Sequence, residues 1–204
     1  MKQQQQKSDS LHKKKMKKLK VNIDASISAA NIERGIGILL TGNGKGKSTS
    51  AFGMVIRSLG YNHKVGIVQF IKGQQLSGEE VYVRDKCPSV TFYQMNTGFT
   101  WETQDRSIDI DAAKESWAVA EKMLQDDSYN LVVLDELTYM LSFKYLDEAT
   151  ILDALNNRPV NQSVVVTGRG GGAALKHWAD TVSEVKEIKH AFKQGIMARK
   201  GVDV

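Results

Sequence analysis

Short, almost entirely apolar runs recur along the chain and restrict the folds it can adopt. A strand that is apolar on both faces must be covered on both faces, as happens in a parallel sheet flanked by helices. Residues between the runs repeat apolar side chains at helical spacing, for example Ala51, Met54, Val55 and Leu59. We therefore predict an α/β fold with a mostly parallel sheet and helices on both faces. The predicted strands are GIGILL at 35–40, KVGIVQF at 64–70, VTFYQM at 90–95, LVVLD at 131–135, SVVVTG at 163–168 and TVSEV at 181–185.

The chain has 204 residues, of which 41% are hydrophobic and 25% charged. This length fits one domain with a substantial core. No apolar run approaches the roughly 20 residues that cross a bilayer, so we expect no membrane span. Cys87 is the only cysteine, and the N-terminus holds no apolar segment for secretion, so a cytoplasmic location is expected.

The basic charge of the chain lies in its first residues. The net charge is +5, but residues 1–20 carry eight lysines and one aspartate, so everything after them sums to −2. Met16, Leu19, Ile23 and Ile27 recur at helical spacing among these polar residues and predict an amphipathic helix. We predict a basic, partly helical arm at 1–34 and a main domain at 35–204. Charge alone favours a solvated arm over one that binds RNA or anionic lipid.

The stretch TGNGKGKSTS at 41–50 lies between the first predicted strand and a predicted helix. Its alternating glycines allow backbone amides to surround a phosphate, and the following helix adds its positive end. Lys47 would place an ammonium group on the phosphates, and the Ser48 hydroxyl would bind a divalent metal ion. This pattern is typical of a P-loop that binds triphosphate in a RecA-like domain. The usual motif requires glycine where Thr41 stands, so counted from Gly42 the loop is one residue short.

LVVLDE at 131–136 resembles the strand that brings carboxylates to the metal ion of a P-loop site. Asp135 and Glu136 are therefore candidate metal ligands, although on its own the pattern is more often a capped strand end. Mg²⁺ is the expected ion because it takes few protein oxygens, with Mn²⁺ as a substitute. The four histidines show no ligand spacing, and we predict no zinc site.

NTGFTWETQ at 96–104 holds two aromatic residues, Phe99 and Trp101, that would project from the same side of an extended segment. Such a pair belongs more often to a core or a partner surface than to a ligand platform. The neighbours of the pair are polar or small. They favour a loop over a core strand and so reduce the preference for a core or partner surface.

These motifs together resemble the P-loop class of ATP:corrinoid adenosyltransferases, from ERG at 33–35 to the C-terminus. The matching segments are GNGKGKST, VQFIKG, TGFTWET, VVLDELTYM, NNRP, TGRG, the A-D-x-V-[ST]-E spacing at 179–184 and KHAF at 189–192. TGFTWET is the most discriminating of them, because P-loop proteins in general lack it.

The resemblance implies transfer of the 5′-deoxyadenosyl group of ATP to the cobalt of a reduced corrinoid such as cob(I)alamin, with release of triphosphate. It also implies that ATP lies in the loop in a reversed direction, which would fit the shortened spacing. Cob(I)alamin is itself a strong nucleophile, so no general base is required. Arg169 is a further candidate for phosphate binding. The resemblance places the triphosphate on Gly42, Asn43, Gly44, Lys45, Gly46, Lys47, Ser48 and Thr49.

The same resemblance places Phe99 and Trp101 beneath the corrin, where they would displace its lower ligand and ease reduction of Co(II). It implies a homodimer whose arm helix covers the corrin site, and a reduced flavin or flavodoxin-type electron donor. Two alternatives from the residues are an ordinary P-loop ATPase or kinase and a non-enzymatic module that uses the lysine-rich arm to bind nucleic acid or a corrinoid.

Overall fold

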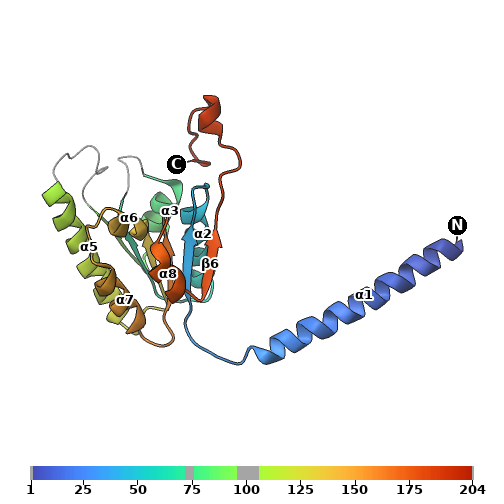
Figure 1. Cartoon of the computed structure of the whole chain (residues 1–204). Helices are drawn as coiled ribbons and strands as arrows, with labels where there is room; N and C mark the ends of the chain where they lie inside the picture. The colour runs from blue at the N-terminus through green and yellow to red at the C-terminus, as the bar shows by residue number, and fades with distance from the viewer. Residues whose placement is uncertain (1, 72–75, 96–105, 204) are drawn as a thin grey trace. The chain divides into compact units, whose positions relative to one another are not determined.

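The computed structural model of the chain describes residues 2–71, 76–95 and 106–203 (Figure 1). It divides into two compact units, residues 1–33 and residues 34–204. The first unit is the helix α1, Lys2–Ala29. The periodicity at 16–27 therefore lies in a helix that begins much earlier than its apolar stripe. Met16, Leu19, Ile23 and Ile27 are exposed along it.

The second unit is built around one six-stranded sheet in which every strand pair is parallel. The strands lie in the order β3-β2-β4-β5-β1-β6, and all six predicted strands are found. The prediction of a parallel α/β fold is thus confirmed. The strands are β1 Gly37–Thr41, β2 Val65–Gln69, β3 Val90–Gln94, β4 Leu131–Asp135, β5 Ser163–Thr167 and β6 Thr181–Glu184.

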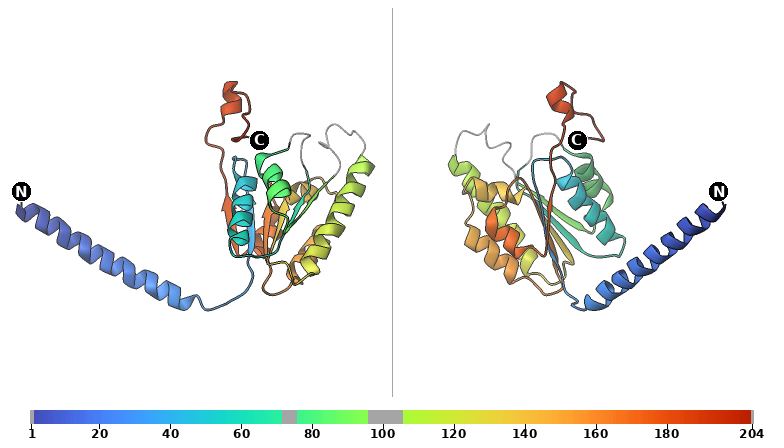
Figure 2. Two further views of the ribbon diagram at one scale, coloured as in Figure 1. Left: turned by 180° about the vertical axis from the view of Figure 1, so that it is seen from behind. Right: turned by 45° about the vertical axis from the view of Figure 1, so that its right-hand side comes forward.

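Helices cover both faces of this sheet (Figure 2). On one face, α2 packs over the central strands and α3 over β3; on the other lie α5, α6, α7 and α8. The sequence pattern had not indicated α3, α6 or α8, which are short. The helices are α2 Lys47–Leu59, α3 Gly78–Lys86, α5 Arg106–Gln125, α6 Leu137–Ser142, α7 Glu148–Asn156, α8 Gly172–Trp178 and the 3₁₀ turn η1 Ala191–Gln194.

The sheet separates two hydrophobic cores. The larger core joins β4 and β5 to α5, where Ala113, Trp117 and Leu124 are buried at helical spacing. The smaller core packs Ala51 and Val55 of α2 against the opposite face. All residues of β2 and β4 are buried, as expected for strands covered on both sides. These two layers fix the strands in one register, so that the loops after β1, β4 and β5 meet at the carboxyl edge of the sheet.

Candidate active site

The loop between β1 and α2 carries the glycines that its conformation requires. Gly42 and Gly46 have φ angles of 98° and 115°, which side chains on L-residues rarely tolerate. A Cβ atom on Gly42 would lie 2.4 Å from the carbonyl oxygen of Val185. Gly46 is the N-cap of α2, so the loop leads directly into the positive end of a helix of 13 residues. The geometry is that of a phosphate-binding loop.

Lys47 is buried at the first position of α2, and its Nζ donates a hydrogen bond to the carbonyl oxygen of Gly44 at 2.9 Å. Burial lowers the pKa of this lysine, and the nearby Arg169 lowers it further, while the carboxylates of Glu136 and Asp135 act in the opposite direction. A buried ammonium group held beside the loop carbonyl is well placed to meet an anionic ligand.

Asp135 ends β4 and is almost completely buried. Its Oδ2 accepts a hydrogen bond from Nε2 of Gln69 at 2.7 Å, and its Oδ1 accepts one from Oγ1 of Thr167 at 2.6 Å. These two partners come from the strands on either side of β4. The neighbouring strands therefore fix the orientation of this carboxylate before any ligand arrives.

Glu136 differs sharply from its neighbour. Its backbone has a φ angle of 59°, an uncommon conformation that turns the chain from β4 into α6, and its amide donates to Oγ1 of Thr167 at 2.9 Å. Its buried Oε2 has no hydrogen-bond partner among the described residues. Burial, and then the charge of Asp135, raise the pKa of Glu136 to about 7, against the opposing effect of Lys47 and Arg169.

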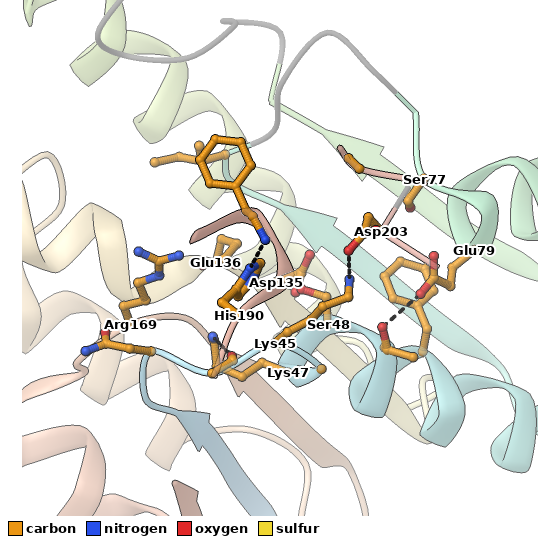
Figure 3. Close-up of a pocket in the computed structure, with 18 of the residues that line it drawn as sticks. Lys45, Lys47, Ser48, Ser77, Glu79, Asp135, Glu136, Arg169, His190 and Asp203 are labelled. Carbon is orange, nitrogen blue, oxygen red and sulfur yellow. Dashed lines mark hydrogen bonds and ion pairs between the residues drawn. The ribbon is translucent and has the colours of Figure 1, made fainter. Parts of the chain in front are cut away.

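The metal ligands predicted from the sequence lie in the same pocket, since Ser48, Asp135 and Glu136 all line it (Figure 3). The part of the chain that the structure describes holds no group of three or more His, Cys, Asp or Glu side chains suited to a metal ion. Two carboxylates and a hydroxyl nevertheless match the oxygen ligands and sparse protein coordination of Mg²⁺. The unpartnered Oε2 of Glu136 is the buried acceptor that a cation would satisfy.

This pocket has a volume of about 570 Å³ and collects most of the residues predicted for nucleotide binding. Arg169, which follows β5, lines the same pocket as Lys47 (Figure 3), and its backbone oxygen accepts a hydrogen bond from Oγ1 of Thr138 at 3.0 Å. Phe99 and Trp101 lie outside the described residues. The predicted residues that line the pocket are Asn43, Gly44, Lys45, Gly46, Lys47, Ser48, Thr49, Asp135, Glu136 and Arg169.

Other lining residues were not predicted. Glu79 at the start of α3 accepts a hydrogen bond from Oγ1 of Thr49 at 3.1 Å. Tyr139 of α6 and Phe143, which caps the carboxyl end of this helix, stack with ring centroids 5.7 Å apart. The Tyr139–Phe143 spacing of four on a helix was the only sequence signal for this stack. The segment after β6 also contributes, through His190, Ala191, Phe192, Ile196, Met197, Ala198 and Asp203.

Among the described helices, none combines the length and the hydropathy needed to cross a bilayer. The lysine-rich α1 is the longest of them, at 28 residues, and is polar on average.

Comparison with known proteins identifies the family. Residues 33–204 match the model of the family described as ATP:corrinoid adenosyltransferase BtuR/CobO/CobP. The corrinoid adenosyltransferase of Pseudomonas aeruginosa is 49% identical over 195 residues, covering 96% of each chain. Those of Escherichia coli K12 and Salmonella typhimurium are 46% and 45% identical, each over 96% of this chain and 99% of the relative. With the fold and a phosphate loop facing two carboxylates, these matches show that the chain belongs to the ATP:corrinoid adenosyltransferase family.

Proposed function

We propose that this protein transfers the 5′-deoxyadenosyl group of ATP to the cobalt of a reduced corrinoid. The electron pair of Co(I) attacks the 5′ carbon, a cobalt–carbon bond forms, and the bond from that carbon to the phosphate oxygen breaks. Triphosphate leaves with the bonding electrons. The observation that carries this proposal is the pocket in which Lys47 and the loop amides face Asp135 and Glu136, in a chain that belongs to this family.

The residues of the pocket stabilise the leaving group. The loop from Gly42 to Ser48 supplies backbone amides, and Lys47 supplies a buried positive charge, so negative charge that develops on the triphosphate is stabilised. Arg169, which lines the same pocket, would add a second cation. The nucleophile is the corrinoid itself, so the site has to position two substrates and does not need a protein base.

Ser48, Asp135 and Glu136 would hold Mg²⁺, or Mn²⁺ in its place, in this proposal. When bound, the ion neutralises charge on the phosphate oxygens. Asp135 is pre-oriented by Gln69 and Thr167. Glu136 supplies the oxygen that has no partner among the described residues. We expect chelation of divalent metal with EDTA to stop turnover, and addition of either ion to restore it.

The corrin side of the site requires residues other than those of the phosphate pocket. We propose that Phe99 and Trp101 contact the corrin, that the active form is a homodimer, and that α1 covers the corrin. We further propose that a reduced flavin or a flavodoxin-type protein supplies the electron. Trp101→Ala should impair turnover started from Co(II) much more than turnover started from Co(I). Equal loss from both states would contradict a role in easing reduction.

Product analysis tests the proposed reaction directly. The protein is incubated with ATP, Mg²⁺ and a corrinoid under strongly reducing conditions, and nucleotides and corrinoids are separated. We expect adenosylated corrinoid and triphosphate in equal amounts. Release of ADP and phosphate without adenosylated corrinoid would instead indicate an ordinary P-loop ATPase or kinase.

Removal of residues 1–20 tests the remaining alternative. If α1 serves as a cover for the corrin, the shortened protein should bind ATP normally and turn over corrinoid more slowly. If the arm makes the protein a nucleic-acid-binding module, the deletion should instead abolish binding of RNA or DNA that the full chain displays.

A further inference from the structure

The segment that follows β6, residues 185–203, begins against the phosphate loop; we call it the C-terminal segment. The carbonyl oxygen of Val185 accepts a hydrogen bond from the amide of Gly44 at 2.7 Å, and the amide of Val185 donates to Thr41 at 2.8 Å. A Cβ atom on Gly44 would lie 2.8 Å from the carbonyl oxygen of Lys186. Because these glycines have no side chains, the C-terminal segment can pack closely against one side of the loop while the other side is left for a phosphate.

The far end of the same segment returns to the loop. Oδ1 of Asp203 lies 3.3 Å from Nζ of Lys45, and the two groups form an ion pair (Figure 3). Oδ2 of Asp203 accepts a hydrogen bond from the amide of Arg199 at 3.0 Å, and the amide of Asp203 donates to the oxygen of Arg199 at 2.8 Å. Asp203 thus closes a tight turn and, with its other oxygen, holds Lys45.

Between these two ends the C-terminal segment forms one wall of the pocket, to which His190, Phe192 and Met197 contribute. It is not anchored in a hydrophobic core, because Ile188, Phe192 and Met197 are 90%, 76% and 83% exposed. A segment with so little apolar burial depends on its polar contacts for its position. Among the described contacts, the pair between Asp203 and Lys45 ties the end of this wall to the phosphate loop.

We propose that Asp203 is a positioning residue that holds the ammonium group of Lys45, and with it the C-terminal wall, in place for the triphosphate of ATP. The proposal rests on the proposed function, since it assigns a polyphosphate to this loop. A lysine ammonium group has three N–H donors, so one can point to Asp203 while two remain for phosphate oxygens. The long lysine side chain is then ordered before the ligand arrives, and less conformational entropy is lost on binding.

The carboxylate of Asp203 also has an opposing effect, because a negative charge near the loop repels a polyphosphate. The side chains of Lys45 and Asp203 are 44% and 29% exposed, so water and salt screen that repulsion. The ammonium group of Lys45 also stands in contact with the carboxylate and neutralises it at short range. We therefore expect the ordering effect to exceed the repulsion, with a modest net gain because the pair is partly exposed.

Calorimetric titration with inorganic tripolyphosphate and Mg²⁺ tests the proposal without a corrinoid. We expect Asp203→Asn to weaken binding about two- to five-fold and Asp203→Glu to restore part of the loss. Lys45→Gln should weaken binding at least as much, and the double variant should bind no more weakly than Lys45→Gln alone. In turnover assays Asp203→Asn should raise KM for ATP and leave kcat within about two-fold.

A matched control is available at the other end of the sheet. Lys64 and Asp126 form an ion pair of 3.4 Å with 42% exposure of both side chains, and both residues precede strands whose other ends face the pocket. Asp126→Asn removes a comparable pair and should leave tripolyphosphate binding unchanged. Thermal unfolding of each variant checks that the fold is retained.

Unchanged or tighter tripolyphosphate binding by Asp203→Asn would overturn the proposal and would mark Asp203 as a competitor of the phosphates. Additive losses in the double variant would also overturn it, because Asp203 would then act independently of Lys45. If the titrations behave as expected while no adenosylated corrinoid forms, the proposed reaction fails and the role of Asp203 stands.

Discussion

Charged side chains lie at both edges of the central sheet, the amino edge where the strands begin and the carboxyl edge where they end. The partners of these side chains differ between the two edges. At the amino edge, Arg34 pairs with Asp180, and Oδ2 of Asp180 also accepts a hydrogen bond from the amide of Gly37 at 2.8 Å. At the carboxyl edge, Lys47 is buried beside a backbone carbonyl, and Oε2 of Glu136 lacks a partner among the described residues.

The pKa values express the same contrast. Hydrogen bonds from Arg34 and Gly37 lower the pKa of Asp180 to about 2, so its ionised form is stabilised by folding. Burial raises the pKa of Glu136 to about 7 and lowers that of Lys47, so both charged forms are disfavoured by folding. The Asp180 carboxylate at the amino edge therefore stabilises the protein, whereas the charges of Glu136 and Lys47 at the carboxyl edge lower its stability in a way that a bound ligand would reverse.

Substitution of Lys47 should have the largest effect. Lys47→Ala removes the buried cation that faces the phosphates, and we expect kcat/KM for adenosylation to fall on the order of 10²- to 10³-fold. Lys64→Ala at the amino edge is the matched control and should change kcat/KM by less than about two-fold, because this lysine pairs with Asp126 and Ser128 on the protein. If Lys47→Ala lowers kcat/KM by less than ten-fold, Lys47 does not have the catalytic role proposed for it.

Substitution of Glu136 should show how much an unpartnered carboxylate lowers the stability of the folded protein. Its folded-state pKa of about 7 exceeds the ordinary value of 4.5, so the folded protein holds the proton more tightly. Wild-type stability should therefore fall as pH rises from about 4.5 to 7 and stay reduced above that. Glu136→Gln carries no such charge, and the metal-free variant should be more stable than wild type by about 2 kcal/mol at pH 8 and equal near pH 4.

Chemical unfolding of both proteins across this pH range measures the difference. Mg²⁺ should then stabilise wild type at pH 8 and have little effect on the variant, since the ion satisfies the carboxylate that Gln lacks. A variant that is less stable than wild type at pH 8 would show that the carboxylate is already satisfied in the folded protein.

Much of the carboxyl edge could be predicted from the sequence because its signals are local. GIGILLTGNGKGKS and LVVLDE each combine an apolar strand with the polar residues that end or follow it, and parallel strands bring those ends together. The segment from His190 to Asp203 could not be predicted in this way. It reaches the pocket through long-range contacts such as that between Asp203 and Lys45, which residue type and local spacing do not indicate.

The contrast between Asp135 and Glu136 was equally beyond the sequence. Asp135 ends β4 and Glu136 follows it, but the side chains of Gln69 and Thr167 hydrogen-bond only to the first of the two carboxylates, because these residues end the neighbouring strands beside Asp135. The turn at Glu136, with its φ angle of 59°, directs the second carboxylate elsewhere. Neither feature can be recognised from residue type or spacing in the sequence.

Asp180→Asn should have the smallest effect and confine it to stability. Because the folded-state pKa of about 2 lies below the ordinary 3.8, the carboxylate contributes stability that is complete above pH 4 and is lost as pH falls toward 2. Asp180 and Arg34 are partly exposed, so we expect a loss of only about 1 kcal/mol at pH 7, shrinking below pH 4. Urea unfolding at pH 7 and pH 3 measures it, and kcat/KM should stay within about two-fold of wild type. An equal loss of stability at both pH values would assign it to the hydrogen bonds of the side chain, and a ten-fold loss of activity would mean that the amino edge also belongs to the site.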